Sequence, residues 1–492
     1  MQTVDFFVFL VFTLGVVLFG CSFFKRSNSS EQFTSANHSL PGWLVGMSIF
    51  ATYVSSISYI GYPGKAFAGN WNAFVFSLSI PIASYVAANY FVPFYRTSGN
   101  ISAYTFLEEK FGTWARLYAS ACYLLTQIAR MGSILYLLAV PMYILMGWDI
   151  HAVIIVTSVA IILYSMLGGI KAVIWTDAIQ GFILIAGALM CLIILWLSMP
   201  GGIVQSFDIA IHAPEGNKFS LGSFDGSLTS STFWVCLIYG IFINLQNYGI
   251  DQNYVQRYHT AKNDKAARFS ALFGGYLFLP VSAIFFLIGT ALYSYYTVYP
   301  SLLPAHIAEK PDYVFPYFIV SSLPVGVRGL LLASIFAAGM STVATSITSS
   351  STILLHDYFD RFAQSLAKRH PLRILQSMSV LVGILGIMVA LAMLQIGSII
   401  DAWWTLSSIF SGGMLGLFLL GYLVPRAKKI HALIGTLIGI VMIGWISLAK
   451  PLGLPGIHLH EYLAIILGTM SIFVIGFLLT FLIKGKKNVK RS

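Results

Sequence analysis

Charged residues are scarce in this chain. Asp, Glu, Lys and Arg make up 9% of its 492 residues, against about 25% in soluble domains. Hydrophobic residues make up 58%, and the mean hydropathy is +0.82. This balance excludes a soluble globular protein and predicts an all-α integral membrane protein.

Cysteines and catalytic motifs are scarce as well. The four cysteines are scattered through apolar segments, at Cys21, Cys122, Cys191 and Cys236. This spacing predicts neither disulfides nor a metal cluster. The chain has no Gly-rich phosphate loop, no His-Glu-x-x-His motif and no acidic cluster, which argues against an enzyme. A polytopic membrane enzyme using Asp177 or a loop His as acid or base remains the alternative class. A third possibility is a transporter-like sensor that moves no solute.

Apolar runs of about 20 residues mark membrane-spanning helices. About 13 spans are expected, at residues 5–24, 41–67, 71–95, 114–145, 149–168, 173–198, 231–253, 267–297, 315–355, 373–397, 402–424, 431–449 and 461–483. The first resembles a retained helix more than a cleaved signal peptide. The connections leave no room for a soluble domain, so we expect one transmembrane domain over residues 1–492. The longest outer connections are expected at 200–230 and 300–316.

Basic residues predict the orientation. Most of the 28 Lys and Arg residues fall in the connections on one side, Arg257 among them, and that side is expected to be cytoplasmic. The N-terminus is then outside and the C-terminus inside, in a multi-pass protein of the cell membrane. This bias and attraction to anionic lipid explain the net charge of +11 without a nucleic-acid partner. We expect a monomer.

Two segments are apolar but interrupted by polar residues, Gly or Pro. They cover residues 50–64 and 241–252. A helix breaks at membrane depth only where it is buried in protein or lines a wet cavity. Two such breaks, one opening each half of the bundle, predict the central binding site of a secondary transporter, and kinks fixed by packing are the alternative.

Arg130 lies near the middle of a predicted span. An arginine at this depth is costly and is expected to face a cavity. Its planar fork suits bidentate capture of a carboxylate. The alternative is a structural role, paired with Asp177, Asp251 or helix-end carbonyls.

Hydroxyl groups are concentrated in residues 337–346. Ser341 and Thr345 share one helical face, and oxygen ligands suit a sodium ion. The hydroxyls could join carbonyls of Ala51 and Val54, freed at the first break, although isolated hydroxyls more often bond back to the preceding turn. Asp177 could be a second cation ligand, a proton carrier or a helix N-terminal partner.

These residues resemble the sodium:solute symporter family. The resemblance covers nearly the whole chain: the first broken helix, residues 168–180, residues 252–257 and the hydroxyl-rich helix from Ala337. It implies a LeuT-like bundle of two inverted five-helix repeats, at 41–198 and 231–424, with an extra helix at 5–24 and two more at 431–483. It also implies sodium as the co-transported ion, held by Ala51, Val54, Ala338, Ser341 and Thr342.

Within that family the chain is most similar to bacterial sodium/sialic acid symporters, on residues 50–58, 128–137, 173–177 and 299–304. This similarity implies that Arg130 holds the carboxylate of a sugar acid. The remaining candidate contacts with the solute are Ser55, Ser56, Ser58, Ser77, Asn244 and Asn247. Ser77 stands where a Gln is expected, and Ala73 stands near an expected aromatic residue.

Some of these symporters have a second sodium site. Its ligands here would be Asp177 and Thr345, although Ala344 lacks a hydroxyl that would help. One sodium is therefore the favoured expectation. The predicted function is sodium-coupled import by alternating access of a small organic solute such as sialic acid. A neutral sugar, another organic acid and an amino acid are the alternative solutes.

Overall fold

The computed structural model describes residues 3–26, 29–394, 407, 410, 413–448 and 459–482, and these residues are almost entirely helical. The long helices are α1 (Thr3–Cys21), α3 (Gly42–Tyr53), α4 (Ser56–Ala68), α5 (Phe74–Val86), α8 (Thr113–Met146), α9 (Ile150–Leu197), α11 (Phe233–Ile250), α13 (Asp264–Val298), α15 (Pro311–Ser322), α16 (Val327–Ile353), α19 (Pro371–Met393), α22 (Lys429–Leu448) and α23 (Leu463–Leu482).

Shorter helices connect and extend them. They are α2 (Ser30–Ser35), α6 (Val92–Ser98), α7 (Thr105–Phe111), α10 (Gly202–Ile211), α12 (Gln252–Thr260), α14 (Ala305–Ala308), α17 (Asp360–Phe362), α18 (Gln364–Arg369) and α21 (Met414–Leu423). Two π-helical segments, η4 (Ala87–Phe91) and η6 (Leu354–Phe359), continue α5 and α16.

Among the described residues, ten helices are long and apolar enough to span a membrane, or eleven if the bent pair α3–α4 is one span. The 48 residues of α9 are more than twice the length that a bilayer core of about 30 Å requires. This element is bent at Gly169, where φ is 58° and ψ is −161°, a conformation that favours glycine. It therefore contains both predicted spans 149–168 and 173–198.

Two boundaries differ from the sequence prediction, and a third prediction lies mostly outside the described residues. The expected span 315–355 is interrupted after Ser322, and α16 begins only at Val327, because Pro324 and Gly326 end the helical run. The expected loop 200–230 contains α10. Of the expected span 402–424, α21 is described from Met414 onward, and nearly all of its preceding part lies outside the described residues.

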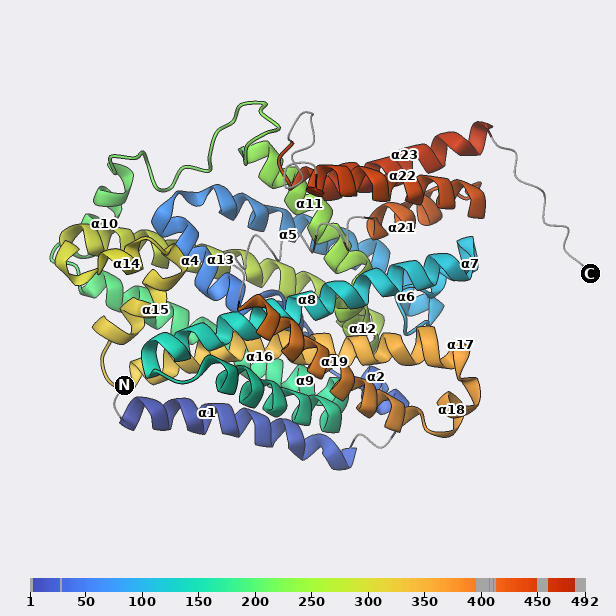
Figure 1. Cartoon of the computed structure of the whole chain (residues 1–492), viewed down its shortest axis with the longest axis horizontal. Helices are drawn as coiled ribbons and strands as arrows, with labels where there is room; N and C mark the ends of the chain where they lie inside the picture. The colour runs from blue at the N-terminus through green and yellow to red at the C-terminus, as the bar shows by residue number, and fades with distance from the viewer. Residues whose placement is uncertain are drawn as a thin grey trace, which may run out of the picture.

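Buried hydroxyl groups are concentrated in one helix of the bundle, within an interior that is otherwise largely apolar. In α16, 94% of the spanning window is buried, against 28% in α1. The α16 interior includes the buried residues Thr345 to Thr352, which are mostly Ser and Thr. Figure 1 shows α1 along one edge of the bundle and α22 and α23 along the opposite edge. The hydroxyl-rich α16 is therefore the structural centre, and exposed apolar side chains such as Leu18 and Val156 suit a lipid surface.

Both predicted breaks are confirmed. The axes of α3 and α4 differ by 56°, and α11 and α12 are separated at the extended residue Asp251. An isolated bridge joins the start of α3 to the end of α12, through hydrogen bonds from Leu40 N to Thr260 O (3.0 Å) and from Lys262 N to Leu40 O (2.9 Å). The two broken helices therefore lie side by side at this end.

Candidate functional site

The first break exposes backbone oxygens. Val54 and Ser55 have extended backbone angles, so the last carbonyls of α3 lose their helical N–H partners. The Thr52 carbonyl accepts hydrogen bonds from Thr342 Oγ1 (3.4 Å) and from Arg130 Nη2 (3.2 Å). One carbonyl thus touches both the hydroxyl-rich helix and the arginine.

Opposite this break, α16 presents hydroxyl groups. Ser341 is fully buried, and its Oγ has no hydrogen-bond partner among the described residues. An unpaired buried hydroxyl costs about 1–3 kcal/mol, so a missing partner is expected. Thr342 Oγ1 also bonds back to the Ala338 carbonyl at 3.1 Å.

The Thr52 carbonyl joins the two elements that carry the predicted sodium ligands. Ala51 and Val54 flank Thr52, whose carbonyl touches Thr342, while Ala338 lies one turn before Thr342 on α16. Every candidate atom is a carbonyl or hydroxyl oxygen, the donor type that hard cations prefer. This oxygen set, with its unpaired serine, fits a sodium ion.

A cavity of about 190 Å³ lies beside the break. Of the predicted solute contacts, Arg130, Ser55, Ser58 and Asn247 line it. The described lining also includes residues that the sequence prediction did not name as contacts: Tyr53, Ile57, Tyr62, Asn72, Ala73, Phe76, Tyr123, Thr126, Gln127, Cys236, Tyr239, Ile243, Gln246, Asp251, Ser407, Met414 and Tyr462. Aromatic rings form much of this wall, and such rings can cover the apolar faces of a solute.

Arg130 faces the cavity from α8. Within the described residues, no carboxylate lies within 4.0 Å of its guanidinium. The expected structural alternative is present in part, since Nη2 bonds to the helix-end carbonyl of Thr52. A guanidinium has five N–H donors, so the group can hold this carbonyl and still bind an anion.

Three predicted solute contacts do not line this cavity. Ser77 Oγ bonds to Ser282 Oγ at 2.7 Å, and Ser56 is fully buried. Asn244 instead supports the wall, since its Oδ1 accepts a hydrogen bond from Tyr53 OH and its Nδ2 donates to Ser79 Oγ at 2.8 Å.

Asp177 and Thr345 are held by Arg257. Nη2 of Arg257 contacts Asp177 Oδ2 at 2.8 Å and Thr345 Oγ1 at 2.6 Å. Ser48 donates to the same carboxylate oxygen at 2.5 Å, and Asp177 Oδ1 has no hydrogen-bond partner in the part of the chain that the structure describes. Both charged side chains are fully buried. Arg257 lies fully buried on α12 inside the bundle, so the prediction that it belongs to a cytoplasmic connection is wrong.

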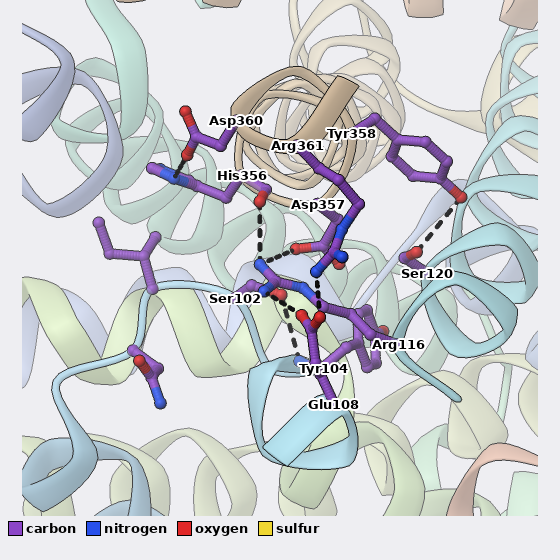
Figure 2. Close-up of polar contacts among 12 residues, drawn as sticks. Ser102, Tyr104, Glu108, Arg116, Ser120, His356, Asp357, Tyr358, Asp360 and Arg361 are labelled. Carbon is purple, nitrogen blue, oxygen red and sulfur yellow. Dashed lines mark hydrogen bonds and ion pairs between the residues drawn. The ribbon is translucent and has the colours of Figure 1, made fainter. Parts of the chain in front are cut away.

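A separate ionic cluster lies where α16 ends (Figure 2). Arg116 pairs with Glu108 at 3.0 Å and with Asp357 at 2.7 Å, and Arg361 also contacts Glu108. Burial acts to raise the pKa of Glu108, but hydrogen bonds from Arg116 and Arg361 outweigh it and hold this pKa below its usual value. The cluster ties α7 and α8 to the end of the α16 segment.

Sequence patterns did not predict the contacts of three groups: the ionic cluster, the buried Arg257 and the cavity-lining Asp251. Two of the ion pairs in the cluster, Arg116 with Asp357 and Arg361 with Glu108, join residues more than 200 positions apart, so no local pattern indicates them. Asp251 did carry a signal, since it lies in the second interrupted segment. A carboxylate placed where a helix breaks is a candidate for a cavity wall.

Comparisons with known proteins identify related transporters. Residues 33–439 match the family described as Sodium:solute symporter family. The chain is 30% identical to the Sodium/sialic acid symporter NanT of Aliivibrio fischeri, over 99% of this chain and 94% of the relative. It is 31% identical to the human Sodium-coupled monocarboxylate transporter 1, over 85% and 68% of the two chains.

A solved structure is similar over the whole bundle. It is a substrate-bound, outward-open state of a Na⁺-coupled sialic acid symporter, described as revealing a novel Na⁺ site. The TM-score is 0.91 at 31% identity, and the match covers 98% of both chains.

Proposed function

The chain belongs to the sodium:solute symporter family and is a multi-pass, sodium-coupled solute symporter with a LeuT-like fold, and we propose that its solute is a carboxylate-bearing sugar acid such as sialic acid. The observation that carries this proposal is the position of Arg130, which lines the cavity and contacts the broken helix. A guanidinium is suited to a carboxylate, and the aromatic and amide groups around it suit a sugar ring and its substituents.

The coupling of sodium binding to solute binding follows from the Thr52 carbonyl, which Thr342 and Arg130 both contact. Sodium would bind the carbonyl oxygens of Ala51, Val54 and Ala338 and the hydroxyls of Ser341 and Thr342. Because Thr52 contacts both Thr342 and Arg130, an ion that orders this break also positions the guanidinium for the solute. Each ligand then favours the same conformational step, as symport by alternating access requires.

The proposed topology follows the distribution of basic residues, with the N-terminus outside and the C-terminus in the cytoplasm of a cell-membrane protein. The repeats cover 41–198 and 231–424, each opening on a broken helix, with additional helices at 5–24 and 431–483. The sodium and solute residues all come from one bundle, so the proposed transport unit is a monomer.

We propose one sodium per transport cycle. A second ion at Asp177 and Thr345 does not fit well, because the Arg257 guanidinium already neutralises the carboxylate and holds the threonine. Ala344 supplies no side-chain oxygen. One sodium carried with one carboxylate is electroneutral, so a membrane potential, which supplies about 2.3 kcal/mol per charge at 100 mV, would not drive accumulation.

Uptake into proteoliposomes tests this function. Labelled N-acetylneuraminate is supplied under an inward sodium gradient to the parent protein, Arg130→Ala and Ser341→Ala, with the potential clamped or imposed. We expect sodium-dependent uptake by the parent, loss in both variants and no response to the potential. Absence of uptake by the parent would reject sialic acid, and a voltage response would reject one-to-one coupling.

Another organic acid is the second candidate solute. The similarity to a human transporter named for monocarboxylates supports it, and Arg130 would serve such an acid equally well. Competition by unlabelled monocarboxylates in the same uptake assay separates the two candidates.

A further inference from the structure

We propose that Asp251 selects among carboxylate solutes by requiring hydrogen-bond donors on the solute, such as hydroxyl, amide N–H or ammonium groups. This inference rests on the proposed function, in which Arg130 holds the carboxylate. The Asp251 carboxylate would be a second contact for the solute in the same cavity, opposite in charge to Arg130. Solutes without hydrogen-bond donors would then bind less well.

Asp251 lies at the second break with one carboxylate oxygen engaged. Its backbone is extended, with φ −77° and ψ 127°. Oδ1 accepts a hydrogen bond from Asn253 N at 2.7 Å and so caps α12. Among the described residues, Oδ2 has only a long contact of 3.4 Å from Gln127 Nε2. Capping therefore explains one oxygen and leaves the other with unused accepting capacity.

The second oxygen is directed toward the part of α8 that carries Arg130. Gln127, which contacts Oδ2, precedes Arg130 by three residues in the helix, so the two share one face. Asp251, Gln127 and Arg130 all line the cavity. None of the ion pairs within 4.0 Å among the described residues joins the acid to the arginine. The cavity thus presents a cationic and an anionic group separately.

This arrangement distinguishes between carboxylates. A solute with an otherwise apolar body satisfies Arg130 but leaves the Asp251 carboxylate facing a second anion and an apolar surface, which is unfavourable. A polyhydroxylated acid donates to Asp251 while its carboxylate binds Arg130, so both buried charges gain partners. The geometry therefore favours sugar acids over simple monocarboxylates.

Asp251→Asn tests the charge while keeping the cap, because Asn caps helices as well as Asp does. The full-length protein is purified in sodium buffer, and apparent affinities are measured from thermal stabilisation by propionate, lactate, glycerate and N-acetylneuraminate. The first three acids share a three-carbon chain and differ in hydroxyl number. We expect the parent to prefer glycerate over propionate by at least about 10-fold, and Asp251→Asn to reduce that preference below about 3-fold.

Asp149→Asn is the matched control. Asp149 caps α9 through a hydrogen bond from Ala152 N at 2.9 Å, and its side chain is 66% exposed. This substitution removes the same charge at a helix cap outside the cavity lining and should leave the preference unchanged.

Two outcomes would overturn the proposal in different ways. Equal glycerate-to-propionate ratios in the parent and Asp251→Asn would make Asp251 a helix cap only, while Arg130 could still bind carboxylates. If no carboxylate stabilises the parent, the proposed function itself is rejected, and the role of Asp251 falls with it.

Discussion

Both broken helices are interrupted at residues with an extended backbone, but the side chains at the two breaks differ. At the α3–α4 break, the groups in contact are a carbonyl, a threonine hydroxyl and an arginine. At the α11–α12 break, an aspartate caps the second helix and contacts an amide. The first break offers neutral oxygens, which suit an ion that sheds its water. The second adds a fixed negative charge, which suits a donor-rich solute.

Both breaks border the cavity, at Ser55 and at Asp251. The first break differs in that its Thr52 carbonyl also contacts Thr342 of α16, the most buried of the candidate spans among the described residues. Arg257 joins the two helices by reaching from α12 to Ser48 on α3, with a hydrogen bond of 2.7 Å. Ion and solute sites can therefore be separate and still be mechanically connected.

Removing Arg257, which connects the two broken helices, should have the largest effect, a loss of folding stability. Arg257→Gln leaves the buried Asp177 carboxylate without its charged partner, and such changes cost about 3–5 kcal/mol of stability. Thermal unfolding of the purified protein measures the loss. Arg268→Gln, at an exposed position, is the control and should be neutral. The double variant Asp177→Asn/Arg257→Gln should recover part of the loss, and equal stability of Arg257→Gln and the parent would contradict the role of this pair.

Removing the positive charge of Arg130 should have the next largest effect, a loss of solute uptake. Arg130→Ala removes the carboxylate partner, and we expect kcat/KM for N-acetylneuraminate uptake to fall more than about 100-fold, or about 2.7 kcal/mol. Arg130→Lys keeps the charge but not the fork, so it should recover only part of the activity. Arg268→Ala serves as the control, and uptake by Arg130→Ala at the parent's rate would remove Arg130 from the solute site.

Removing a single hydroxyl opposite the first break should weaken sodium binding. Ser341→Ala should raise the sodium concentration for half-maximal binding about 10-fold, equivalent to about 1.4 kcal/mol, measured with ²²Na⁺ on the purified protein. Ser379→Ala is the matched control, because that buried hydroxyl bonds back to Leu375 O at 2.9 Å. An unchanged sodium affinity in Ser341→Ala would place the ion elsewhere.

The smallest effect on stability is expected for the ion pairs of Glu108, in the cluster beyond the end of α16. The lowered pKa of Glu108 means that its ion pairs contribute fully above the ordinary glutamate pKa of about 4.3. That contribution is lost as pH falls through the still lower pKa of the folded state. Because its partner Arg361 is partly exposed, the contribution should be at most about 1 kcal/mol.

Glu108→Gln measures this contribution. Its melting temperature should lie below that of the parent at pH 7 and at pH 5, and the difference should shrink below about pH 4. Glu109→Gln is the control, since the neighbouring Glu109 takes no part in these ion pairs. A difference that disappears already between pH 7 and pH 5 would contradict the lowered pKa.

The sequence indicated the membrane class, most spans, both breaks and the presence of Arg130 at a central site. Each of these follows from local properties: apolar length, interrupting residues and an arginine too deep to reach the interface. The family resemblance extended this to sodium ligands, and the two elements that carry them are in contact through Thr52 and Thr342. Their binding of sodium stays a prediction.

Only the tertiary structure decided which polar groups meet. Helix packing places Arg257 against Asp177, which lies 80 residues earlier in the chain, so a residue considered for a possible second sodium site already has a cationic partner. It places Asp251 beside the α8 face that carries Arg130, and it puts Ser77 against Ser282 instead of the cavity. The physical reason is that membrane insertion is encoded by local hydropathy, whereas buried polar contacts depend on how distant helices rotate and pack.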